Sequence, residues 1–213
     1  ILLQKNSSYK LSSAHVGSMG GIQAIRRGEA HIAGIHLLDE KDGSYNHSFV
    51  KKYFPNGGVS LIECVGRTQG IMVAKKNPKS IIGISSLCAP DIRYINRQKG
   101  SGTRILFDYI CKKEGITVDS INGYDHEEFT HNDVAKLIAK GQADAGMGVH
   151  AAAKLYDLDF IPIYNERYDL LIPDSMLEHP GIQEIIHILR SEEFSEKAAM
   201  LGGYVLNNPG LPR

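Results

Sequence analysis

Residues 96–104, with the sequence NRQKGSGTR, decide how we interpret the fold. Residues 91–95 before this stretch are β-branched enough for a short strand, and residues 105–111 after it carry apolar side chains at helical spacing. The chain is therefore expected to turn at residues 100–102 from a strand into the N-terminus of a helix. Such a terminus has unpaired N–H groups and a partial positive charge.

The side chains of this turn suit an anion. Two glycines allow a ligand to approach the backbone closely, and Ser101 and Thr103 add hydroxyl donors. Arg97 and Arg104 bring planar cationic groups suited to oxyanions. An ordinary surface turn with a Ser/Gly N-cap fits these residues equally well. Taken alone, the stretch leaves both interpretations open.

The composition excludes several classes of partner. The chain has 213 residues, with 24 Lys plus Arg and 24 Asp plus Glu. This balance indicates no direct binding to nucleic acid or to an anionic membrane, so any anion must be held by a local site. No apolar run approaches the roughly 20 residues of a membrane-spanning helix.

The cysteines indicate a chain without disulfides. Cys64, Cys88 and Cys111 are odd in number and lack metal-ligand spacing, so we expect small buried or half-buried thiols. A cytoplasmic location is expected, with a periplasmic or extracellular one left open. Because the chain begins at Ile1 without a methionine, we expect a fragment or a processed piece.

Strand-like and helix-like segments alternate along the chain. The expected strands are residues 9–16, 30–38, 59–65, 69–74, 91–95, 143–148, 159–163 and 168–172. The expected helices are residues 22–27, 47–54, 84–88, 103–115, 134–140, 150–156, 182–189 and 194–201. The alternation predicts an α/β fold, with mixed and mostly parallel sheets covered by helices on both faces.

Two joins between strands, at residues 65–69 and 163–168, are too short for a helix. They predict a two-lobed protein whose chain crosses twice at a hinge. Residues 1–66 and 168–213 would form lobe 1, and residues 67–167 lobe 2. Ligands of such sheets bind beyond the carboxyl ends of the strands, in this case in a cleft between the lobes.

One arginine lies in each of the two joins between strands. An arginine buried at a hinge usually pairs with a carboxylate, so Arg67 and Arg167 are expected to pair with groups such as Glu166 or Asp169.

Four expected turns lead from a strand end into a helix start. They lie at Gly17-Ser18, at residues 100–103, at Phe129-Thr130 and at residues 146–148. Each can offer N–H groups or a hydroxyl to one cleft. Their convergence favours a small anion held by hydrogen bonds.

Catalytic and metal interpretations are weaker. The sequence around Ser101 is not Gly-x-Ser-x-Gly, and no nucleotide P-loop motif occurs. The nine histidines include no His-x-x-x-His pair and no histidine at ligand spacing from a cysteine. A transition-metal site across the cleft stays an alternative, although capping or core histidines are favoured.

The motifs together resemble a known family. They are VGSMGG at 16–21, RGEAHIAGIHLLD at 27–39, NRQKGSGTR at 96–104, TH at 130–131 with VA at 134–135, ADAGMG at 143–148, ERYD at 166–169 and LGGY at 201–204. This set resembles the periplasmic-binding-protein-like domain that is fused to the molybdenum-insertion protein of molybdopterin biosynthesis or to helix-turn-helix regulators. That family is similar to the type II solute-binding fold of molybdate and tungstate receptors.

The resemblance implies a non-enzymatic oxyanion binder or sensor without a resident cofactor. In related tungstate receptors an arginine before a Ser-Gly-Thr turn contacts the oxyanion. Here that arginine is Arg97, and Ser101, Gly102 and Thr103 form the turn. Ser18 and the N–H of Met19 match a hydroxyl-and-amide position on the other lobe. The segment Gly-Ser-His-Asp that usually ends the family's first strand is absent from this sequence.

The predicted ligand-binding residues are Ser18, Met19, Arg97, Ser101, Gly102, Thr103, Thr130 and Gly148. The expected ligand is molybdate or tungstate, and the expected partner is a fused or separate molybdopterin-biosynthesis or helix-turn-helix domain. One alternative is an effector-binding domain of a LysR-like regulator for a small organic anion. Another is an enzyme of cofactor biosynthesis that uses the cleft to position molybdate.

Overall fold

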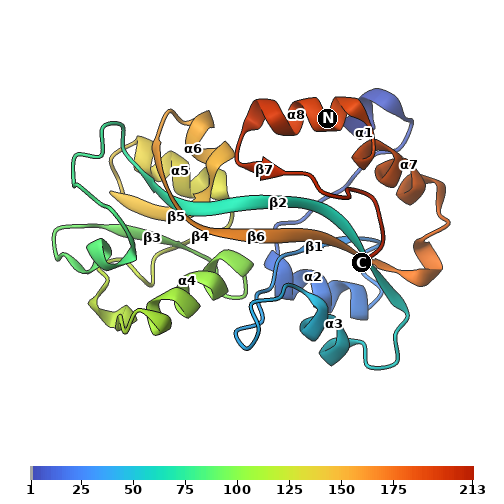
Figure 1. Ribbon diagram of the computed structural model, residues 1–213, viewed down its shortest axis with the longest axis horizontal. Coiled ribbons are helices and arrows are strands. Elements are labelled where there is room, and N and C mark those ends of the chain that lie inside the picture. Colours follow the sequence, from blue (N-terminus) through green and yellow to red (C-terminus); the bar gives the residue numbers. More distant parts are fainter. Residues whose placement is uncertain (1) are drawn as a thin grey trace. The chain divides into compact units, whose positions relative to one another are not determined.

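The computed structural model describes residues 2–213, which form two compact units (Figure 1). Unit 1 comprises Ile1–Arg67 and Arg167–Arg213, and unit 2 comprises Thr68–Glu166. Strands β2 (Val59–Val73) and β6 (Asp159–Pro173) each contain residues of both units. The unit boundary therefore falls within two strands, at the arginines of the helix-free joins.

The continuity of β2 and β6 corrects the sequence analysis, which divided each into two strands. Figure 1 shows each as one long ribbon. Gly66 and Arg67 keep extended backbone because they pair with Val205 and Tyr204 of β7 (Tyr204–Val205). A short polar stretch need not break a strand when a neighbouring strand continues to satisfy its backbone hydrogen bonds.

Unit 2 contains the parallel part of the sheet. Strand β3 (Tyr94–Arg97) pairs in parallel with β4 (Glu127–Glu128) and with β5 (Ala145–Val149), and β5 pairs antiparallel with β2. Helices α4 (Gly102–Lys113), α5 (His131–Ala139) and α6 (His150–Leu155) follow these strands in the same order. Two short 3₁₀ helices, η1 (Ile84–Cys88) and η2 (Val118–Ser120), lie in the connections.

The core of unit 2 forms where α5 packs on the sheet. Val134 and Ile138 of α5 are buried together with Met72 of β2 and Ile95 of β3. Gly146 permits this packing, because a Cβ there would lie 2.4 Å from Val134 Cγ1 and 2.8 Å from the carbonyl oxygen of Ile95. The small residues of β5 therefore allow α5 to pack closely on the sheet.

Unit 1 is built on antiparallel pairs. Strand β1 (Ala33–Ile35) pairs with β6, and β7 pairs with β2. Its helices are α1 (Leu2–Asn6), α2 (Gly17–Arg26), α3 (His47–Tyr53), α7 (Pro180–Leu189) and α8 (Glu192–Leu201), with η3 (Asp174–Met176) before α7. Ile62, Ile172, Ile182, Ile186 and Leu189 form a buried cluster under α7.

The start of the chain differs from expectation. Residues 9–16, predicted as a strand, have no regular structure, and Leu11 and Val16 are 56% and 51% exposed. These residues bury too little apolar surface to support a strand. Helix α1 was not anticipated, and α2 begins at Gly17 instead of Ile22. The strand predicted at residues 30–38 is reduced to β1.

The other predicted helices are present, with ends shifted by a few residues, and the mixed α/β fold is confirmed. Within residues 2–213, no helix is both long and apolar enough to cross a membrane.

Candidate functional site

The parallel strands of unit 2 bring three turns to one edge of the sheet. Because β3, β4 and β5 run in the same direction, their carboxyl ends share an edge. We call the turns at residues 98–101, 129–130 and 149–150 the carboxyl edge of unit 2. Helices α4 and α5, of 12 and 9 residues, begin there and direct their N-termini towards it. Aligned peptide dipoles place about half a positive charge at each such terminus.

Ser101 caps α4. Its Oγ accepts a hydrogen bond from Arg104 N at 3.2 Å, and its backbone N–H donates to the carbonyl oxygen of Gln98 at 3.1 Å. Gly100 makes the turn possible because its φ of 82° lies in the left-handed region. Ser101 is only 1% exposed, and within the described residues its hydroxyl proton has no acceptor.

Thr103 is oriented by a residue of β2. Its Oγ1 accepts a hydrogen bond from Gln69 Nε2 at 2.9 Å, and the two residues are 1% and 0% exposed. Gln69 reaches the carboxyl edge because it is paired with Val149 at the end of β5. The Thr103 oxygen thus accepts from the Gln69 amide NH₂ group, and no described residue accepts the Thr103 hydroxyl proton.

Arg97 ends β3 and is only 8% exposed. Its Nε donates to Gln98 Oε1 at 3.1 Å and to the carbonyl oxygen of Glu128 at 3.3 Å, and its Nη2 donates to that of Phe129 at 2.9 Å. The guanidinium thus joins the ends of β3 and β4. Direct contact of Arg97 with an anion stays a prediction.

Arg104, the second arginine of the turn, contacts residues of β3, β4 and its own helix. Arg104 Nη1 lies 3.3 Å from both the carbonyl oxygen of Arg97 and Glu127 Oε1, and its Nε lies 3.3 Å from Asp108 Oδ1. The guanidinium carbon also lies 4.0 Å from the centre of the Tyr124 ring. Arg104 therefore braces α4 against β3 and β4.

Thr130 and Gly148 lie at the same edge but differ from the α4 turn. Thr130 caps α5, where its Oγ1 accepts from Asp133 N at 3.0 Å and donates to Asp133 Oδ2 at 2.6 Å. Its hydroxyl proton is thus already used. A Cβ on Gly148 would lie 2.5 Å from Met72 Cε and 3.4 Å from His131 Nδ1, so this glycine allows close packing.

Ser18 and Met19 lie in unit 1, in the first turn of α2. Ser18 is 1% exposed, and its Oγ accepts from His36 N at 3.2 Å. Met19 is half-buried. The His36 ring stacks on Tyr168 at 5.6 Å, and the Arg67 guanidinium lies 4.5 Å from the same Tyr168 ring. Ser18 thus contacts the backbone of His36, whose ring is stacked on the Tyr168 ring that Arg67 also contacts.

Arg167 pairs with a carboxylate as expected, but the partner is Glu63 and neither Glu166 nor Asp169. Arg167 Nη2 lies 2.6 Å from Oε2 of Glu63, which is 6% exposed. Successive residues of a strand project to opposite faces, which disfavours a pair between Arg167 and its neighbour Glu166. Asp169, fully buried, accepts instead from Asn46 Nδ2 at 2.8 Å and from Arg213 Nη1 at 2.6 Å.

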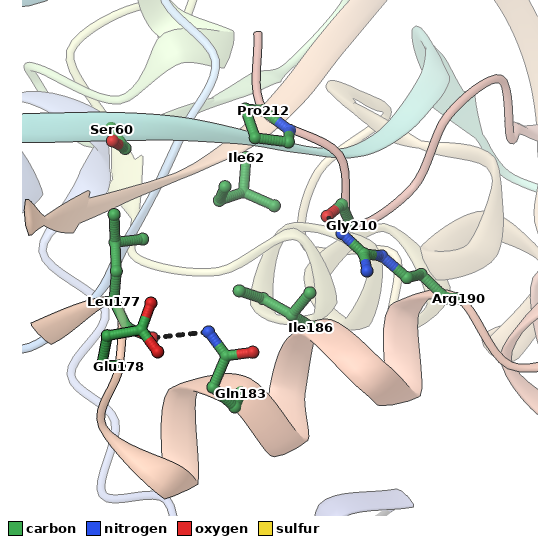
Figure 2. A pocket seen from close by; sticks show the side chains of 9 residues that line it. All are labelled: Ser60, Ile62, Leu177, Glu178, Gln183, Ile186, Arg190, Gly210 and Pro212. Carbon is green, nitrogen blue, oxygen red and sulfur yellow. Dashed lines mark hydrogen bonds between the residues drawn. The ribbon is translucent and has the colours of Figure 1, made fainter.

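Two cavities lie apart from the predicted site residues. One, of about 200 Å³ in unit 1, is lined by residues of β2, α7 and the C-terminal segment (Figure 2). The other, of about 420 Å³ in unit 2, is lined by residues between Asp119 and His126. None of the predicted ligand-binding residues lines either cavity. In the described part of the chain, no three His, Cys, Asp or Glu residues are grouped to hold a metal ion.

The fold defines the class of protein. Solved structures that share it include an ABC-type phosphate transport receptor from Vibrio cholerae, with a TM-score of 0.57 and 16% identity over 97% of this chain and 92% of that one. A putative phosphate ABC transporter substrate-binding protein from Clostridium perfringens has a TM-score of 0.57 and 16% identity, over 91% and 86% of the two chains. The architecture is therefore the type II fold of periplasmic binding proteins, as expected.

The chain belongs to the PBP superfamily, since residues 2–190 match the PBP superfamily domain. It is 35% identical over 188 residues to the uncharacterized protein YvgK of Bacillus subtilis (strain 168). The aligned residues cover 88% of this chain and 60% of YvgK. It is also 36% identical over 107 residues to an uncharacterized protein in the ferredoxin 2Fe-2S gene 5' region of Clostridium pasteurianum, covering 50% of this chain and 95% of that protein. The chain thus spans less than two thirds of the length of YvgK.

Proposed function

We propose that this chain is a non-enzymatic binding domain for a small oxyanion, with molybdate or tungstate as the expected ligand. One observation carries the proposal. Ser18, Ser101 and Thr103 lie at helix N-termini, are each 1% exposed, and each accept a hydrogen bond from an N–H group. Among the described residues, none of these three hydroxyl protons has an acceptor.

Each of these buried donors favours a ligand that accepts hydrogen bonds. A hydroxyl carries one proton, and once an N–H group occupies one of its lone pairs the proton is directed elsewhere. Leaving a buried donor unpaired costs about 1–3 kcal/mol, which an oxyanion oxygen would relieve. The N-terminus of α4 adds its dipole and its free N–H groups to the same effect.

Two acidic side chains near the carboxyl edge of unit 2 already have interaction partners. Asp133 is hydrogen-bonded within the α5 cap, and Glu127 lies 3.3 Å from the Arg104 guanidinium. The positive charge of Arg104 offsets part of the repulsion that Glu127 would exert on an approaching anion.

Two lines of similarity support the choice of ligand. Among proteins of similar fold, one is an ABC-type phosphate transport receptor, a second has been solved with bound phosphate, and PEB3 has been solved with bound L-phospholactate. Tetrahedral oxyanions are thus among the ligands of this fold. The preference for molybdate or tungstate rests on the resemblance of residues 96–104 to the motif of the molybdenum-linked family.

A second candidate is an effector-binding domain for a small organic anion. Phe129, at the carboxyl edge of unit 2, is 60% exposed and offers an apolar surface to the body of such a ligand. The OxyR protein of Corynebacterium glutamicum shares the fold, with a TM-score of 0.55 and 16% identity over 84% of this chain and 54% of OxyR. Under either function, the proposed partner is a fused or separate domain of molybdopterin biosynthesis or a helix-turn-helix regulator.

Isothermal titration calorimetry of the chain with molybdate, tungstate, sulfate and phosphate tests the proposal. We expect saturable binding of molybdate or tungstate, at least about 10-fold tighter than that of sulfate or phosphate, which corresponds to 1.4 kcal/mol. The double variant Ser101→Ala/Thr103→Val should lose most of this binding. No binding of any of the four anions would contradict the proposal, and binding of small carboxylates alone would favour the organic-anion candidate.

Ser191→Ala is the matched control. Ser191 caps α8 in unit 1 as Ser101 caps α4, with its Oγ accepting from Phe194 N at 3.2 Å. Its hydroxyl proton is already donated to the carbonyl oxygen of Ile188 at 2.7 Å. The control should therefore lose cap stability without losing oxyanion affinity.

A further inference from the structure

Gln98 holds the first position of the α4 turn. Its backbone N–H donates to the carbonyl oxygen of Glu128 at 3.1 Å, and its carbonyl oxygen accepts from Ser101 N at 3.1 Å. The main chain of Gln98 is therefore fixed both to β4 and to the cap of α4. The residue is 6% exposed.

The orientation of the Gln98 amide follows from its neighbour. Gln98 Oε1 accepts from Arg97 Nε at 3.1 Å. A guanidinium has donors only, so the oxygen of the amide must face Arg97 and the NH₂ group must face away from it. Within the described residues, Gln98 Nε2 has no hydrogen-bond partner.

We propose that Gln98 is a ligand-binding residue whose Nε2 donates to an oxygen of the oxyanion, and that Arg97 is the positioning residue that orients it. This inference rests on the proposed function. Gln98, Ser101 and Thr103 lie within six residues of one turn, and each has a buried donor without an acceptor among the described residues. An anion bound at the N-terminus of α4 would satisfy all three donors.

The role of Arg97 changes accordingly. The Arg97 side chain donates hydrogen bonds to Gln98 Oε1 and to the carbonyl oxygens of Glu128 and Phe129. Its positive charge still favours an anion at the carboxyl edge of unit 2. Arg97 affects ligand binding indirectly, because its hydrogen bond fixes the orientation of the Gln98 amide.

Two substitutions of Gln98 test the inference. Gln98→Glu replaces the NH₂ donor by an oxygen of similar size and offers Arg97 a carboxylate, so the unfolding midpoint without ligand should be unchanged or raised. Oxyanion affinity should fall at least about 10-fold, because a donor to a charged ligand is lost and a negative charge is added. Gln98→Met removes the donor without adding charge, and should weaken binding about 5- to 10-fold.

Gln183→Glu in unit 1 is the matched control. Gln183 Nε2 donates to the carbonyl oxygen of Leu177 at 2.7 Å (Figure 2). The same chemical change should lower the unfolding midpoint there and leave oxyanion affinity at the wild-type value. Opposite effects on stability and affinity at Gln98 would distinguish ligand binding from a structural role.

The outcomes separate the inference from the function on which it rests. If the wild-type chain binds an oxyanion and Gln98→Met binds it equally well, the role of Gln98 is overturned and the proposed function stands. If the wild-type chain binds none of molybdate, tungstate, sulfate and phosphate, both are overturned. Weaker binding by both Gln98 variants, with the control unchanged, supports the inference.

Discussion

Gln69 Nε2 on β2 donates to Thr103 Oγ1 on α4 over 2.9 Å, and neither side chain is more than 1% exposed. This hydrogen bond joins two residues 34 positions apart in the sequence. It fixes the Thr103 side chain at the N-terminus of α4 and leaves the hydroxyl proton to donate in another direction. Gln69 of the sheet thereby orients the Thr103 hydroxyl, which can donate to a ligand.

A double-mutant cycle tests this relationship. Gln69→Met should weaken oxyanion binding several-fold in the wild-type chain, because the Thr103 hydroxyl then loses its fixed orientation. In a Thr103→Val background the same substitution should have no further effect on affinity. Equal losses in the two backgrounds, measured by calorimetry, would show that Gln69 acts through the fold and not through Thr103.

A substitution of Ser18 tests whether a residue of unit 1 binds the ligand. Ser18→Ala removes a buried hydroxyl in the first turn of α2, and should lower oxyanion affinity about 5- to 10-fold if that hydroxyl donates to the ligand. The exposed Ser13 supplies a control, since Ser13→Ala should change nothing. An affinity for Ser18→Ala equal to that of wild type would remove unit 1's serine from the ligand-binding set.

Asp144 should make the stability of the chain depend on pH in acid. Arg93 Nε and Nη2 donate to Asp144 at 3.0 and 2.9 Å, and this interaction holds the pKa of the Asp144 carboxyl below its usual range. A depressed folded-state pKa contributes stability above the ordinary aspartate value, and that contribution is lost as the pH falls through the folded-state pKa.

Asp144→Asn should therefore lower the free energy of unfolding by about 1 kcal/mol at pH 7 and flatten its decline in acid. Denaturant titrations at several pH values measure this. Asp157→Asn is a suitable control, because the Asp157 side chain is 84% exposed beside Lys75 and such pairs contribute little. An acid decline as steep in Asp144→Asn as in wild type would contradict the assignment.

Two cysteines should be unreactive in the folded chain. Burial raises the pKa of Cys64 and of Cys111 to about 12. Almost no thiolate then exists at pH 8, and thiolate is the reactive form. We expect slow labelling of both residues by a thiol reagent in the native chain and rapid labelling in denaturant, as followed by mass spectrometry. Rapid native labelling of Cys111 would show that α4 opens readily.

The parts of the fold set by local sequence were predictable. Residues 100–103 and Phe129-Thr130 were expected to lead into helix starts, and Ser101 and Thr130 cap those helices, because a side-chain cap depends only on residues two or three positions away. The strand predicted at residues 9–16 was wrong. Alternating apolar residues form a strand only where the rest of the fold offers a surface against which their side chains are buried, and the local sequence does not contain that information.

Long-range partners explain what the sequence missed. Glu63 and Arg167 form an ion pair because β2 and β6 are neighbours in the sheet, and neither residue stands out in a local motif. Gln69 was assigned only to a strand, and its contact with Thr103 depends on the register of β2 beside β5. Gln98 lay inside the key stretch, but only the position of Arg97 reveals which end of its amide is unused.

The central claim is that an oxyanion binds at the N-terminus of α4, and an NMR titration of backbone amides tests it most directly. The amides of Gly102 and Thr103 in the first turn of α4 have no partner within the helix and should shift progressively and saturably on addition of molybdate or tungstate. The amides of Glu192 and Glu193, at the capped N-terminus of α8, should stay in place. Saturable binding without any shift at Gly102 and Thr103, or with equal shifts at both helices, would contradict the account.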